Sequence, residues 1–215
     1  MGMPDPVYLV AILVLLSLAP FVAIMVTSFV KIVVVLSLVR NAMGVQQTPP
    51  NMVINGLAVI LTVYIMAPVA QDAFDILQAK KPDLKNIDSV KESVIACMEP
   101  LKKFLVKHTH MKERKFFVET AKKLWPKERA ATVTDEDFLV LVPAFTVSEL
   151  VSAFQIGFLI YLPFIVIDLI VSNILLSLGM MMVSPMTISL PFKLLLFVLV
   201  DGWTRLIHGL VLTYT

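Results

Sequence analysis

The chain contains uncharged apolar segments long enough to cross a lipid bilayer, and these segments limit what it can fold into. Residues 52–70 carry no charge over 19 residues, residues 150–167 none over 18, and residues 169–192 none over 24. An α-helix of about 20 apolar residues spans the ~30 Å hydrocarbon core. We therefore predict an all-α membrane protein built of long bent helices and helical hairpins around a helical soluble insert.

The overall composition supports this class. Hydrophobic residues make up 58% of the chain and charged residues only 16%, and the net charge of +2 predicts no nucleic-acid partner. The single cysteine, Cys97, excludes an intrachain disulfide and a cysteine-based metal cluster. No Lys or Arg precedes the first apolar run, so the basic n-region of a standard secretory signal is absent, and we expect this run to be retained.

Three parts follow from the distribution of charge. We predict a first membrane helical hairpin over residues 1–79, a polar helical insert over 80–136, and a second membrane hairpin over 137–215. The first apolar run, residues 7–39, would form about 50 Å of helix, which exceeds the bilayer core, so we expect it to tilt, bend at Pro20 or leave the bilayer. In the next helix Pro68 predicts a bend or an exit.

The polar insert is the only part that resembles a water-soluble protein. Of the 18 basic residues 14 lie in the window 80–137, together with 10 of the 16 acidic ones. Apolar residues at three- and four-residue intervals predict amphipathic helices over 89–107 and 112–125. Such a pair buries little alone, so we expect it to dock onto partner copies or the membrane segments. His108 and His110 lack an acidic or cysteine companion and predict a solvated surface rather than a metal site.

Seven charged side chains lie within or beside the apolar segments. Each would cost roughly 3 kcal/mol at the bilayer centre, so they must pair or meet water. We predict ion pairs between helices or between subunits, whereas an ion path through a small channel or secondary transporter is the alternative. For Lys31, a functional role and snorkelling to the interface stay equally open. The seven are Lys31, Arg40, Glu149, Asp168, Lys193, Asp201 and Arg205.

Three consecutive methionines occupy the predicted turn of the second hairpin. Met180, Met181 and Met182 lie between Gly179 and Pro185. Methionine is unbranched and polarizable, and it adapts to a changing contact surface, which favours a soft seal. Ordinary apolar packing is the alternative interpretation.

No catalytic arrangement is present in the sequence. It contains no Gly-x-Ser-x-Gly, no His-Glu-x-x-His and no phosphate-binding glycine loop. Asp168 and Asp201 could be considered as an intramembrane aspartyl dyad, but their neighbours do not suggest that chemistry. We predict neither an enzyme nor a cofactor.

Two long blocks resemble a known family. Residues 27–69 read TSFVKIVVVLSLVRNAMGVQQTPPNMVINGLAVILTVYIMAPV, and residues 141–203 read LVPAFTVSELVSAFQIGFLIYLPFIVIDLIVSNILLSLGMMMVSPMTISLPFKLLLFVLVDGW. Both closely resemble the FliP/SctR/YscR family, the R-type subunits of the type III secretion and flagellar export apparatus. The polar insert matches only in position and character.

This resemblance implies a function. Family members form a pentamer that joins Q-, S- and T-type subunits into an export gate, through which unfolded proteins cross the bacterial inner membrane. On the match, Met180, Met181 and Met182 would be the pore gasket, and the seven charges would lie at subunit contacts. The absent signal favours the virulence (injectisome) branch over the flagellar branch.

The resemblance and the charge distribution disagree about the side of the insert. The family places it in the periplasm, whereas its excess of Lys and Arg would place it in the cytoplasm by the positive-inside rule. Since that rule weakens for long loops, we follow the resemblance and expect a multi-pass inner-membrane protein with a periplasmic insert.

Overall fold

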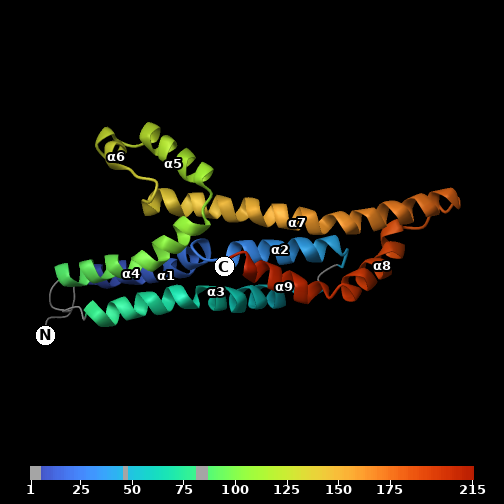
Figure 1. The fold of residues 1–215 in the computed structure, drawn as a ribbon, viewed down its shortest axis with the longest axis horizontal. Coiled ribbons are helices and arrows are strands. Elements are labelled where there is room, and N and C mark those ends of the chain that lie inside the picture. Colours follow the sequence, from blue (N-terminus) through green and yellow to red (C-terminus); the bar gives the residue numbers. More distant parts are fainter. Residues whose placement is uncertain (1–5, 46–47, 81–86) are drawn as a thin grey trace.

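The computed structural model describes residues 6–45, 48–80 and 87–215, and all regular structure in these ranges is helical, which confirms the predicted all-α class. Figure 1 shows an elongated bundle in which the longest helix, α7, runs along most of the long axis. The helices are α1 (Pro6–Met25), α2 (Phe29–Ala42), α3 (Asn51–Lys80), α4 (Ile87–His108), α5 (Met111–Leu124), α6 (Lys127–Thr132), α7 (Phe138–Ser177), α8 (Pro185–Leu199) and α9 (Gly202–Leu212).

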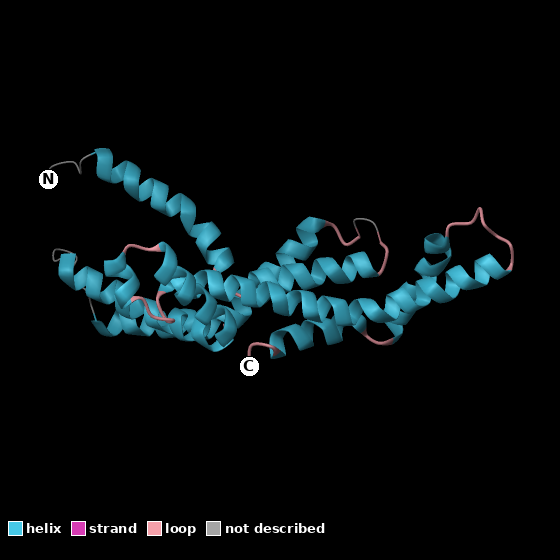
Figure 2. Ribbon diagram, turned by 90° about the horizontal axis from the view of Figure 1, so that it is seen from above, coloured by secondary structure: helices cyan, strands magenta, loops and turns pink. Residues whose placement is uncertain are grey.

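The first apolar run forms two helices rather than one. The break lies between Met25 and Phe29, whereas Pro20, the expected bend, lies inside α1. Thr27 and Ser28 occupy the break, and the Thr27 hydroxyl donates to the Ala23 carbonyl at 2.8 Å. Hydroxyl side chains that bond the local backbone compete with helix continuation. Figure 2 shows that α1, which precedes the break, diverges from the other helices.

Prolines do not end the long helices. The helix α3 continues through Pro68 to Lys80, and α7 contains both Pro143 and Pro163. A proline removes one helical hydrogen bond, but apolar membrane helices tolerate the loss. Residues 69–80 include three alanines and two glutamines, which favour helix, so α3 does not end at Pro68. The bend or exit from the bilayer at Pro68 stays a prediction.

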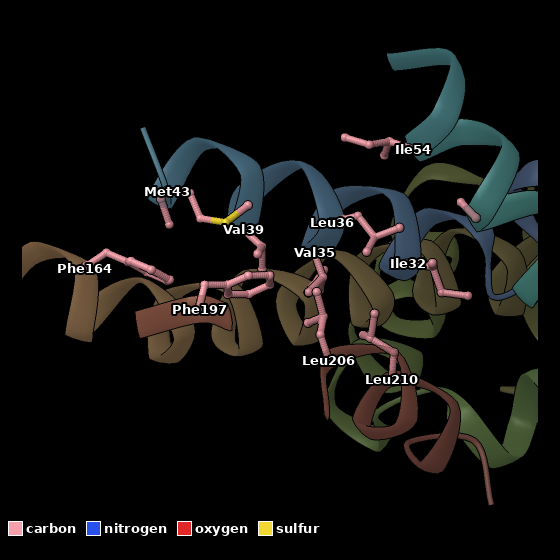
Figure 3. Close-up of a cluster of buried hydrophobic side chains, with 13 residues drawn as sticks. Ile32, Val35, Leu36, Val39, Met43, Ile54, Phe164, Phe197, Leu206 and Leu210 are labelled. Atoms are coloured by element: carbon pink, nitrogen blue, oxygen red, sulfur yellow. The ribbon is translucent and has the colours of Figure 1, made fainter. Parts of the chain in front are cut away.

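The helix α2 is central to the largest buried core and lies between α3 and α7 (Figure 1). Its contact with α7 is close, because a Cβ atom at Gly157 would lie only 2.3 Å from Leu38 Cδ1. Figure 3 shows side chains from α2, α3, α7, α8 and α9 meeting in this core. Its buried members are Ile32, Val35, Leu36, Val39, Ala42, Met43, Ile54, Ala58, Ala153, Phe164, Phe197, Leu206 and Leu210.

The two amphipathic helices predicted in the polar insert form as α4 and α5, with bounds that differ by one or two residues. Within the single chain, α4 packs on α3 and α7, and α5 packs on α7, so the apolar helices are one docking surface of the insert. Docking onto partner copies stays a prediction. Leu105 of α4 is fully buried in a cluster with Leu141 and Phe145 of α7. The insert is therefore joined to the apolar helices.

Among the described residues, α3 and α7 are long and apolar enough to cross a membrane. The helices α8 and α9 would make a third span if they are taken as one helix bent by 60°. Much of this apolar surface is uncovered within the chain; Phe154, Phe158 and Leu159 of α7, for example, are 58%, 62% and 65% exposed. Such continuous apolar surface requires lipid or other protein chains.

Candidate functional site

The methionine loop lies at the tip of the hairpin formed by α7 and α8. The helix α7 ends in a Schellman arrangement: Gly179 has a φ of 71°, its N–H donates to Leu176 O at 3.0 Å, and the Met180 N–H donates to Leu175 O at 2.9 Å. Pro185 begins α8 at the first helical turn. Local sequence at both ends therefore keeps the intervening methionines outside the helices.

These methionines contact little of their own chain. Met180 is 44% exposed, Met181 81% and Met182 99%. Core packing, the alternative considered for this run, is therefore absent within the single chain. An apolar, flexible tip of this kind is suited to contact with other molecules.

A polar cluster at the base of this hairpin holds it against α2. Lys193 of α8 is 3% exposed, and its Nζ lies 2.6 Å from Asp168 Oδ2 and 3.4 Å from the Ala42 carbonyl oxygen. Ser189 donates its hydroxyl to Asp168 Oδ1 at 2.6 Å. Since Ala42 ends α2, this cluster joins three helices.

Replacing Lys193 with Met is expected to lower the free energy of unfolding by about 2 kcal/mol, because hydrogen bonds to charged groups are lost while the aliphatic packing is kept. Denaturation of the protein in detergent measures this loss. Lys122→Met, at an exposed position of α5, is the matched control and should change little. Equal stability of the two variants would contradict a structural role for this cluster.

A second ion pair lies deeper in the bundle. Lys31 Nζ of α2 lies 2.8 Å from Glu149 Oε1 of α7, and the two side chains are 6% and 1% exposed. The Tyr214 hydroxyl donates to Glu149 Oε2, and its ring lies 4.2 Å below the Lys31 ammonium group. Both carboxylate oxygens are thus occupied, which offsets the cost of burying the charge.

The other three charged residues, Arg40, Asp201 and Arg205, form no ion pair among the described residues. Arg40 donates to Asn51 Oδ1 at 2.6 Å and to the Pro49 carbonyl at 3.2 Å. Asp201 and Arg205 are exposed and form no salt bridge within the described ranges. Asp201 has a φ of 52° and lies at the bend between α8 and α9. Pairing of these three with another subunit stays a prediction.

His108 ends α4, and His110 directly precedes α5. No group of three potential metal-ligating side chains occurs in the described part of the chain. The His108 ring packs between Phe104 and Tyr214, at centroid distances of 4.7 and 5.1 Å. Desolvation, followed by the charges of Lys107 and Lys31, lowers the pKa of His108 to about 4. His108 is therefore neutral at physiological pH.

The comparison with known proteins decides the family. A sequence model of the FliP family matches residues 12–210, which is nearly the whole chain and includes the polar insert. The chain belongs to the FliP family. The resemblance carried by residues 27–69 and 141–203 is thus confirmed, and it extends through the insert as well.

Several relatives of this FliP-family chain are similar over almost their full length. The Yop proteins translocation protein R of Yersinia pestis is 58% identical over 212 residues, which are 99% of this chain and 98% of the relative. The hypersensitivity response secretion protein HrcR of Ralstonia nicotianae is 51% identical over 208 residues, 96% of both chains. The virulence protein YscR of Salmonella typhimurium is 45% identical over 220 residues, covering all of both.

The geometry of the FliP-family chain bears on the alternative of an ion path. Glu149 and Asp168 lie 19 residues apart on α7, which corresponds to about 28 Å along the helix. Each is held by its own lysine, and the 18 residues between them are uncharged. A direct proton relay between these two carboxylates within one chain is therefore excluded by distance.

Sequence reasoning missed two members of these polar clusters. Ser189 bonds to Asp168 and Tyr214 to the buried Glu149, yet each looks unremarkable in an apolar sequence. Ser189 lies four residues before Lys193, on the same face of α8, and this spacing was the available signal. No comparable signal exists for Tyr214, because its partners come from distant helices.

Proposed function

We propose that this protein is a structural subunit of the type III secretion export apparatus in the bacterial inner membrane. The names of its relatives refer to translocation in Yersinia pestis, to secretion in Ralstonia nicotianae and to virulence in Salmonella typhimurium. The similarity covers nearly the full length of each, which supports a common role. These names favour the injectisome branch over the flagellar one.

Within this apparatus the protein lines a pore. The observation that carries the proposal is the exposed methionine loop, Met180–Met182, at the tip of a hairpin whose base is fastened to α2. A ring of such loops, contributed by about five copies, would close against itself and then deform around many different unfolded polypeptides, because its contacts are not directional.

The partners follow from the same assignment. The exposed apolar faces of α3 and α7 would contact lipid, further copies and the Q-, S- and T-type subunits, and the insert would face the periplasm. Arg40, Asp201 and Arg205, which lack salt bridges within the described residues, are available for contacts between subunits. Transport would be driven by other components, and this subunit is structural rather than enzymatic.

The native mass of the protein tests this function. After co-expression with its genomic neighbours and purification in mild detergent, we expect one large complex that contains about five copies together with smaller membrane subunits. A stable monomer or dimer without partners would contradict the export gate and support the small channel or transporter. Native mass spectrometry separates these outcomes, since it counts the copies of each chain.

A further inference from the structure

A polar cleft of about 400 Å³ lies where the turn between α4 and α5 meets α2, α7 and the end of α9. The backbone N–H of His110 in this turn donates to the Ser148 hydroxyl of α7 at 3.0 Å, which holds the turn in place. The residues that line the cleft and can donate hydrogen bonds include Lys31, Lys107, His108, His110, Ser152 and Gln155, and no carboxylate lines it.

The donors in the cleft are largely unused. Glu149, which lies beside it, has one oxygen bonded to Lys31 and the other to Tyr214. In the part of the chain that the structure describes, the side chains of Lys107, His108, Ser152 and Gln155 form no hydrogen bond or ion pair. The remaining charge is therefore the positive one of Lys107, surrounded by neutral donors.

The helix α5 begins at Met111, directly after His110, which lines the cleft. The N–H groups of Glu113 and Arg114 bond to the His110 carbonyl, which leaves those of Met111 and Lys112 as the unpaired donors of the first turn. The positive end of a helix dipole favours an anion. Glu113 lies in this turn but does not line the cleft.

The position of the cleft relative to the apolar segments is also informative. Residues 150–167 are uncharged and would form about 27 Å of helix, close to the thickness of the hydrocarbon core. Ser152 and Gln155 lie in the first two turns of this segment, and the polar insert contacts α7 next to them. The cleft therefore lies at the level of lipid headgroups if this segment spans the membrane.

We propose that this cleft binds an anionic phosphate group, carried by a membrane lipid headgroup or present as free phosphate. Lys107 supplies the charge, while His108, Ser152 and Gln155 donate hydrogen bonds to the phosphate oxygens. The site goes beyond the export function and does not depend on it.

Lipid retention tests the proposal. The full chain is reconstituted with equal phosphatidylglycerol and phosphatidylcholine, extracted in mild detergent, and its bound lipid is counted by native mass spectrometry. We expect phosphatidylglycerol to be retained preferentially, and Lys107→Ala to weaken this retention about fivefold, because one basic residue near the surface contributes about 1 kcal/mol. Lys103→Ala is the matched control, since Lys103 is exposed on the same helix but does not line the cleft.

A second variant separates loss of the site from loss of the fold. Gln155→Leu removes a donor from an exposed position without changing charge, and it should also weaken retention of phosphatidylglycerol. Unchanged retention in both Lys107→Ala and Gln155→Leu would overturn the site, as would equal loss in Lys103→Ala.

Inorganic phosphate distinguishes the two sources of the group. Phosphate is titrated against chloride at equal ionic strength while the His108 ring signals are followed by NMR. Release of phosphatidylglycerol together with a shift of the His108 signals supports a site that also accepts free phosphate. Retention of the lipid without an effect of phosphate supports a lipid site. No preference for phosphatidylglycerol and no effect of phosphate would overturn the proposal.

Discussion

Replacing Lys31 with Met is expected to lower the free energy of unfolding by about 3–5 kcal/mol. Removing one partner of a buried ion pair leaves the other charge without compensation in an apolar environment. Here that charge is Glu149, which is 1% exposed and would keep only the Tyr214 hydroxyl as a partner. Chemical denaturation in detergent, followed by circular dichroism, measures the loss.

Two controls accompany this variant. Lys80→Met breaks the pair with Glu92, whose side chain is 80% exposed, and should cost less than about 1 kcal/mol because water screens exposed charges. The double variant Lys31→Met/Glu149→Gln should recover much of the stability, since it removes both buried charges. If Lys31→Met is as mild as Lys80→Met, the buried pair does not stabilise the fold. If transport is lost while stability and assembly are normal, the ion path gains support.

Replacing Met180, Met181 and Met182 together with Gly is expected to make the assembled complex leak small ions without preventing assembly. The three side chains contact little of their own chain, so their loss should not affect the fold, whereas a ring built from them would lose its apolar contacts. Conductance of the purified complex in planar bilayers measures the leak.

Two further variants sharpen this test. Met186→Gly changes another exposed methionine, which lies in α8 outside the loop. This variant should leave the complex impermeable to small ions. Replacement of the three loop methionines by Leu should keep the seal against ions but slow the passage of protein, because Leu is less flexible than Met. Unchanged conductance in the Gly variant would show that the loop does not form the seal.

The sequence predicted the helical class, the two amphipathic helices and the hairpin turn because each depends on local patterns. Uncharged segments predict apolar helices, and Gly179 and Pro185 bound the turn in the structure as expected. The break after Met25 was not predicted, because a tilt, a bend at Pro20 or an exit from the bilayer was expected for this run. The break lies at Thr27 and Ser28, and the Thr27 hydroxyl bonds to the helix backbone there.

The partners of the charged residues could not be predicted in the same way. Lys31 and Glu149 each stood out as a charge in an apolar segment, but their pairing depends on the packing of α2 against α7. That packing requires the small residue Gly157 opposite Leu38, a relation between distant positions. The partner of Arg40 is the side-chain amide of Asn51, which carries no charge and therefore does not stand out in the sequence.

The pairing of Lys31 with Glu149 also has a consequence for synthesis. The lysine leaves the ribosome roughly 120 residues before its partner, which corresponds to about 6–24 s at usual translation rates. During this interval the ammonium group must stay in contact with water or lipid headgroups, because its burial alone costs roughly 3 kcal/mol or more. We therefore expect α2 to enter its final position only when α7 arrives, so the order of membrane insertion differs from the order of the chain.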